Sequence, residues 1–107
     1  MTTIKIKNGE ITKISITGHS DYEPGNDIVC AGISTLAYTM LNYLRQAEKN
    51  YWISGYSYRE GPGDIRMEFK THWMCVREIS AIIDMFRTGM EMLASQYPDN
   101  VRVEVES

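Results

Sequence analysis

Apolar and polar residues alternate near the N-terminus of the chain, and this pattern predicts two short strands. The alternation runs from Ile4 to Lys7 and resumes from Ile11 to Thr17 after a turn. A period of two is typical of a strand that buries one face. A three-residue turn over residues 8–10 would pair Ile4 with Ile14 and keep the isoleucines on one face. We therefore expect that register.

Two longer segments have apolar residues spaced by three or four, which predicts amphipathic helices. The first runs from about Ile28 to Lys49, and the second from Val76 to Tyr97, where Pro98 stops it. The first apolar stripe contains Val29, Ile33, Leu36, Met40, Leu44 and Ala47. The second contains Val76, Ile79, Ile83, Phe86, Met90, Leu93 and Tyr97.

Three further segments have strand patterns and complete the fold prediction. They are Tyr51 to Tyr58, Ile65 to Phe69 and Val101 to Val105, with a turn at 60–63 between the first two. The order is therefore ββαββαβ. An α+β fold, with a mostly antiparallel sheet and both helices packed on one face, is the simplest way to bury both stripes. We expect residues 1–107 to form a single domain.

Composition restricts the classes of protein to which the chain could belong. The chain has 107 residues, of which 23% are charged, and its formal net charge is −3. This charge argues against binding nucleic acid or an anionic membrane through bulk positive charge. The N-terminal alternation lacks the basic and apolar regions of a signal peptide, and two cysteines are too few for a disulfide framework. We expect a cytoplasmic protein with reduced thiols.

Cys30 is the first candidate for chemistry, because it falls in the first turn of the first predicted helix. Asp27, three residues earlier, is placed to be the helix N-cap. Free backbone N–H groups and the positive end of the helix dipole gather at this turn. They would stabilise a thiolate and could donate to a developing oxyanion. The alternative is a cysteine that serves only as a small buried hydrophobic residue.

His19 is the second candidate, at the end of the second predicted strand, where the chain enters a polar loop. If that strand and the first helix are neighbours, the loop returns His19 toward Cys30. An imidazole within hydrogen-bond reach would complete a Cys/His pair for nucleophilic catalysis. The alternative is an exposed loop histidine that caps a carbonyl. Asp27 could instead orient His19, although one carboxylate could hardly serve both as cap and as orienting group.

The segment from Gly18 to Ser34 consists of Gly18-His19, a loop that contains Gly25, and then Asp-Ile-Val-Cys-Ala-Gly-Ile-Ser over residues 27–34. This segment resembles the motif of the ribosomal-processing cysteine proteases called Prp. The Tyr-Pro-Asp at residues 97–99, after an amphipathic helix, is also similar to family members. The loop between His19 and Cys30 is one residue shorter than in the family pattern, which affects the shape of the substrate cleft.

The resemblance implies a cysteine endopeptidase, with Cys30 as nucleophile and His19 as its proton-transfer partner. It also implies a small cytoplasmic homodimer that removes the N-terminal extension of bacterial large-subunit ribosomal protein twenty-seven, supports ribosome assembly and needs no cofactor or metal. Ser34, one turn after Cys30, could bind the substrate backbone or simply permit close packing. Gly18 and Gly25 are expected to supply unusual backbone angles at the loop ends. We expect the loop over residues 20–26 to be mobile until peptide binds.

Other functions remain possible from the residues alone. A non-catalytic, ribosome-associated peptide-binding module would keep the fold without the reactive thiol. A redox sensor would need Cys75 close to Cys30, and a zinc site would use His72 and Cys75 with His19 and Cys30. We expect Cys75 instead to begin the second helix as a core residue. Direct RNA binding would need a basic stripe that the sequence lacks.

Aromatic residues on the third predicted strand suggest a covered surface. Trp52, Tyr56 and Tyr58 share a parity on this strand, opposite the side that holds Ile53. Because both helices are assigned to one face of the sheet, we expect this aromatic row to face away from them. A second copy of the chain would then cover it, or the row would line a substrate groove.

Overall fold

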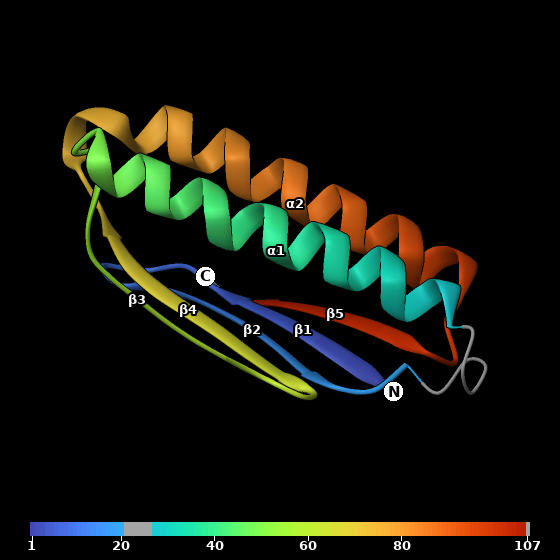
Figure 1. Ribbon diagram of the computed structural model, residues 1–107. Coiled ribbons are helices and arrows are strands. Elements are labelled where there is room, and N and C mark those ends of the chain that lie inside the picture. The colour runs from blue at the N-terminus through green and yellow to red at the C-terminus, as the bar shows by residue number, and fades with distance from the viewer. Residues whose placement is uncertain (21–26, 107) are drawn as a thin grey trace.

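The structure is a computed structural model that describes residues 1–20 and 27–106 (Figure 1). The strands are β1 (Thr2–Lys7), β2 (Thr12–Gly18), β3 (Ile53–Gly61), β4 (Asp64–Thr71) and β5 (Val101–Glu106). The helices are α1 (Ile28–Lys49) and α2 (Val76–Gln96), and a short 3₁₀ helix, η1 (Trp73–Cys75), leads into α2. The predicted element order is confirmed.

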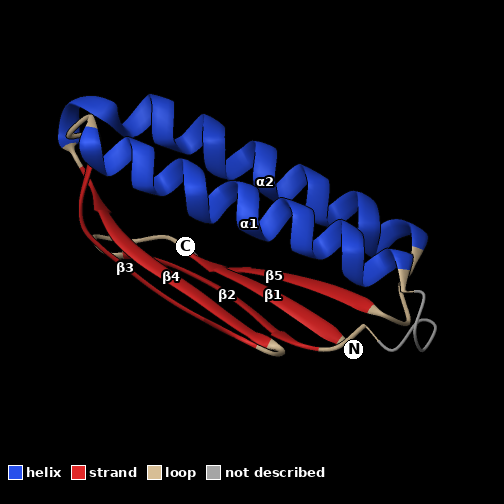
Figure 2. Cartoon of the chain, in the orientation of Figure 1, coloured by secondary structure: helices blue, strands red, loops and turns tan. Residues whose placement is uncertain are grey.

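The strands form one sheet in the order β3-β4-β2-β1-β5. All neighbouring strands are antiparallel except β1 and β5, which run parallel. Figures 1 and 2 show both helices side by side across one face of this sheet. The predicted α+β architecture is therefore confirmed. Within the described ranges, neither helix is apolar enough along its length to cross a membrane.

The core lies between the helices and the sheet, as the apolar patterns require. Ile4 and Ile6 of β1 are buried there, together with Phe69 of β4. The helix stripes meet them through seven buried residues of α1 and four of α2. Val76 was expected in the stripe but is exposed. It occupies the first position of α2, at the end of the helical layer, where less of the molecule covers it.

The register of the first hairpin differs from the prediction by two residues. Ile4 pairs with Ile16, and Ile6 pairs with Ile14, whereas the predicted three-residue turn would pair Ile4 with Ile14. The connection between the paired strands is correspondingly longer than three residues. A slip of two residues leaves every side chain on its original face. The hydrophobic pattern therefore predicted the buried face correctly but could not distinguish between these two registers.

The prediction of an aromatic row opposite Ile53 was wrong. The pairing of β3 with β4 shifts between Ser54 and Ser57, where Gly55 adopts a positive φ of 61°. Such a bulge reverses the alternation of side chains along the rest of the strand. Tyr56 consequently packs against the core beneath the helices, as Ile53 does, and Tyr58 pairs with the buried Met67.

Tyr56 joins the edge strand to the helical layer, because its hydroxyl donates a hydrogen bond of 2.9 Å to the carbonyl of Leu41 in α1. We expect Tyr56→Phe to lower the free energy of unfolding by about 1 kcal/mol. Burial raises the pKa of Tyr56 to about 12, and the neighbouring Tyr58 adds to the effect. The neutral phenol is therefore favoured by folding, so its contribution is complete below pH 10 and is lost as the pH rises toward 12. Urea unfolding of the wild type and of Tyr56→Phe at pH 8 and at pH 11 measures this effect. A difference in the free energy of unfolding between the two proteins that is the same at both pH values would contradict it.

Candidate active site

Cys30 lies in the first turn of α1 and is exposed to solvent. Asp27 is the N-cap, and its Oδ1 accepts a hydrogen bond of 2.8 Å from the backbone N–H of Cys30. The N-cap prediction is confirmed, and the alternative of a buried structural cysteine is wrong. An exposed sulfur at a helix N-terminus is accessible to a substrate and lies where the helix dipole favours negative charge.

His19 follows directly after β2 and is also exposed. Its imidazole lies against the turn between β3 and β4, because a Cβ atom added to Gly63 would be 2.8 Å from His19 Nε2. The same turn binds the end of β2, since the Gly18 N–H donates a 2.9 Å hydrogen bond to the Gly63 carbonyl. The N-terminal ammonium of Met1 donates to the His19 carbonyl. The His19 backbone and ring are therefore supported by two separate parts of the chain.

Ser20 connects the His19 segment to the helix that carries Cys30. Its hydroxyl donates to Oδ2 of Asp27, while Oδ1 of the same carboxylate caps Cys30. The side-chain amide of Asn100 donates a 2.7 Å hydrogen bond to the Ser20 carbonyl. Neither Ser20 nor Asn100 was predicted from the sequence as a site residue. Ser20 stands beside His19 and could have been suspected, but no local pattern predicts a contact between residues 80 positions apart.

The other predicted site residues have varied outcomes. Gly18 has a positive φ of 95°, so the unusual backbone expected there is confirmed. Ser34 is half-buried, one helical turn after Cys30. Ser20, the first residue of the loop predicted to be mobile, is buried and hydrogen-bonded. Gly25 and the other loop residues, 21–26, lie outside the described residues, as does their predicted mobility. Gly63 was missed, although the Gly61-Pro62-Gly63 turn was recognised.

Cys75 lies at the opposite end of the helical layer from Cys30 (Figure 1). α1 begins near Cys30 and has 22 residues, which corresponds to a length of about 33 Å. Cys75 precedes α2 and packs half-buried against the core, as expected. Both the redox pair and the zinc site with His72 needed these ends to meet, so the structure contradicts both alternatives. No three potential ligands among His, Cys, Asp and Glu cluster in the part of the chain that the structure describes.

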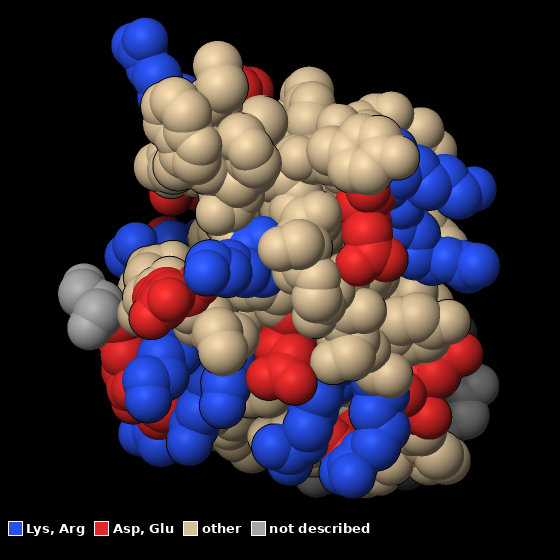
Figure 3. All heavy atoms as spheres, turned by 90° about the vertical axis from the view of Figure 1, so that its left-hand side faces the viewer, with Lys and Arg blue, Asp and Glu red and all other residues tan. Residues whose placement is uncertain are grey.

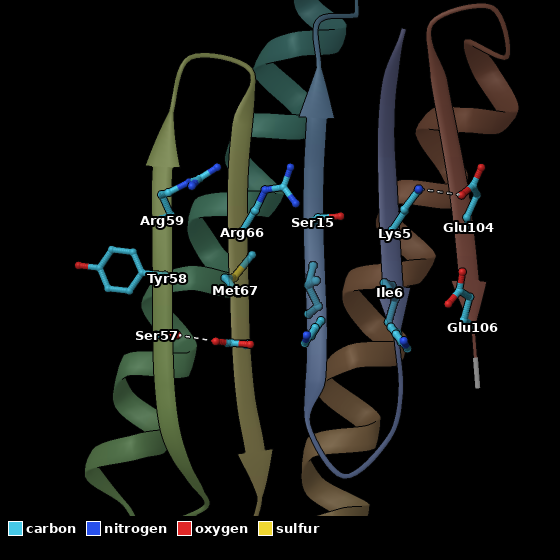
Figure 4. Close-up of a pocket in the computed structure, with 14 residues that line it drawn as sticks. Lys5, Ile6, Ser15, Ser57, Tyr58, Arg59, Arg66, Met67, Glu104 and Glu106 are labelled. Atoms are coloured by element: carbon cyan, nitrogen blue, oxygen red, sulfur yellow. Dashed lines mark hydrogen bonds and ion pairs between the residues drawn. The ribbon is translucent and has the colours of Figure 1, made fainter.

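A hollow of about 440 Å³ lies on the sheet face that the helices leave open (Figure 4). Its lining contains neither His19 nor Cys30. Cations and carboxylates are mixed there, as in Lys5, which pairs with Glu104 at 3.8 Å. At its edge, hydrogen bonds from Arg59 and Arg66 lower the pKa of Asp64. The alternation of charges is that of a solvated sheet face, and the candidate chemistry lies elsewhere.

Comparison with protein-family models shows to which family the chain belongs. Residues 1–102 match the family model described as cysteine protease Prp. The chain therefore belongs to the cysteine protease Prp family. The resemblance of the segment from Gly18 to Ser34 is thus confirmed at the level of the family, which is one of cysteine-type peptidases. A search of curated protein sequences found no significant match.

Solved structures similar to the chain include Prp proteins and one named only by its locus. Staphylococcus aureus Prp with a covalently linked product peptide is 21% identical, with a TM-score of 0.74 over 99% of this chain and 100% of that one. The same protein with a substrate peptide is 22% identical, with a TM-score of 0.69 and the same two coverages. SMU.848 of Streptococcus mutans is 23% identical, with a TM-score of 0.69 over 99% of this chain and 94% of that one. At these identities the likeness shows a shared fold.

Proposed function

We propose that this Prp family member is an endopeptidase that removes the N-terminal extension of bacterial large-subunit ribosomal protein twenty-seven in the cytoplasm, and thereby supports ribosome assembly. The entire chain, residues 1–107, would act as one catalytic domain. One observation carries the assignment of the site: Cys30 is exposed in the amide-rich first turn of α1, and Asp27 connects this turn to Ser20, the residue beside His19. Family membership supports the reaction class, and the peptide-bound S. aureus Prp structures support a peptide as substrate.

The proposed mechanism uses a thiol and an imidazole. His19 accepts the proton of the Cys30 thiol, and the sulfur attacks the carbonyl carbon of the scissile peptide bond. Backbone N–H groups at the start of α1 would donate to the resulting oxyanion. The tetrahedral intermediate collapses, the peptide C–N bond breaks, and His19 returns its proton to the leaving amine. Water, deprotonated by His19, then attacks the thioester, which releases the acid product and restores the thiol.

The decisive experiment is incubation of the protein with a synthetic peptide that spans the ribosomal extension, followed by mass spectrometry. We expect a single cleavage in the peptide. The alternative is a non-catalytic peptide-binding module, which would leave the peptide uncut. Alkylation separates the two further, because an activated Cys30 should react with iodoacetamide near pH 7 much faster than the thiol of an unfolded chain.

We also propose that the protein acts as a homodimer, and an exposed apolar end patch supports this. The end patch consists of Tyr51, Trp73 and Met74, which are 84%, 77% and 66% exposed. The His72 N–H donates a 2.9 Å hydrogen bond to the Trp52 carbonyl, which brings the two contributing segments together. Figure 3 shows uncharged surface gathered over this end of the helical layer. Tyr, Trp and Met are enriched in protein–protein interfaces, and Trp and Tyr often contribute most of the binding energy of such an interface.

Trp73→Ser tests whether the end patch holds the dimer. We expect the wild type to have the mass of a dimer by light scattering at micromolar concentration, and the variant to dissociate at concentrations at least ten-fold higher. Met85→Ser is the matched control, because Met85 is 80% exposed but lies in the middle of α2. A monomeric wild type, or equal effects of the two substitutions, would refute this interface.

A further inference from the structure

We propose that Ser20 is a positioning residue, whose buried hydroxyl holds the His19 segment against the helix that carries Cys30. This inference rests on the proposed Cys/His chemistry and goes beyond it, because it assigns a role to a residue outside the pair. Ser20 is only 1% exposed, although it follows an exposed residue at the mouth of a polar loop. A buried hydroxyl requires a hydrogen-bond partner, and here the partner is the N-cap carboxylate itself.

The geometry makes the Asp27 carboxylate a junction between two segments. One oxygen accepts from the Cys30 N–H, and the other accepts from the Ser20 hydroxyl. His19 is covalently adjacent to Ser20, so a displacement of Ser20 moves the imidazole relative to the sulfur. Hydrogen bonds to an ionised acceptor are about twice as strong as neutral ones. Two such bonds therefore fix the His19 backbone with respect to the first turn of α1.

Asn100 secures the junction from a third segment. Its side-chain amide donates to the Ser20 carbonyl at 2.7 Å, and its own carbonyl accepts from the Thr2 N–H at 2.9 Å. The connection between α2 and β5 is thereby tied both to the start of β1 and to Ser20. Ser20 is therefore tied to the start of α1 through its hydroxyl and to the segment before β5 through its carbonyl.

Steady-state cleavage of the ribosomal peptide by Ser20→Ala tests the proposal. We expect kcat to fall about ten-fold while KM changes less than two-fold, because a displaced imidazole affects the reaction more than peptide binding. Ser20→Thr keeps the hydroxyl and should recover most of kcat. Ile53→Val, at the far end of the sheet, is a control for stability loss alone and should retain wild-type kcat.

The outcomes separate this proposal from the proposed function. If the wild type and Cys30→Ala process the peptide equally, the Cys/His chemistry itself fails. If the wild type cleaves and Cys30→Ala does not, a wild-type kcat in Ser20→Ala overturns the positioning role, as does a loss no larger than that of Ile53→Val. Should Ser20→Ala not fold, Asn100→Ala removes the bond to the Ser20 carbonyl instead. A lowered kcat then supports the proposal, and an unchanged kcat refutes it.

Discussion

Replacing Cys30 with alanine or serine should reduce peptide cleavage by at least 1,000-fold, because alanine has no nucleophile and a serine hydroxyl is a much weaker one than a thiolate. The serine variant is the more informative of the two. It keeps the size and a hydroxyl nucleophile, but a serine hydroxyl ionises far less readily than a thiol. Since Cys30 is exposed and its capping bond uses the backbone N–H, neither variant should alter the free energy of unfolding by more than about 0.5 kcal/mol. Mass spectrometry of the peptide and urea unfolding measure the two effects.

Two controls complete this experiment. Cys75→Ser leaves the thiol of Cys30 in place and should process the peptide like the wild type, since Cys75 lies at the other end of the helices. His19→Ala should retain the fold and flatten the rising limb of the pH–rate profile. Cleavage by Cys30→Ser within ten-fold of the wild type would eliminate the thiol mechanism, and an unchanged pH profile in His19→Ala would eliminate the histidine from it.

The sequence predicted the fold well where a pattern repeats over many residues. Both helices and the buried faces of β1 and β2 could be predicted from the spacing of apolar residues. A shift of one residue in the pattern would turn a whole set of apolar side chains toward solvent. Local exceptions were not predictable in this way. The bulge at Gly55 placed the side chains of Tyr56 and Tyr58 on the opposite face of the strand from the one predicted. The two-residue slip in the first hairpin keeps every side chain on its face, so the apolar pattern could not reveal it.

The candidate site was predictable to the extent that its parts are local. Asp27 and Cys30 are three residues apart, so helix capping alone relates them. The position of His19 against Gly63 depends on how β2 meets the turn between β3 and β4. The Asn100 bond depends on the parallel pairing of β1 with β5. Both contacts join segments that are distant in the chain, and only the assembled sheet brings them together.

Gly18→Ala should be strongly destabilising, by about 3 kcal/mol, for two reasons that a matched variant can separate. The first is backbone strain, because φ is 95° and L-residues disfavour this region. The second is steric, because an added Cβ would overlap the backbone carbonyl oxygen of Met1. Gly55 shares the first condition, with φ of 61°, but has nothing within 4 Å of the added Cβ. Gly55→Ala should therefore cost only about 1 kcal/mol.

The difference in the free energy of unfolding between these two alanine variants, measured in urea, reports chiefly on the close approach between Gly18 and the carbonyl of Met1, the residue before β1. This approach matters for the site, because the Met1 ammonium is bonded to the His19 carbonyl and Gly18 directly precedes His19. Relief of the overlap must move either the start of β1 or the backbone that carries the imidazole. At a temperature where both variants are folded, Gly18→Ala should consequently lose peptide cleavage while Gly55→Ala keeps it. If Gly18→Ala and Gly55→Ala had equal stabilities and equal activities, Met1 would move aside without an energetic cost, and β1 would not support His19.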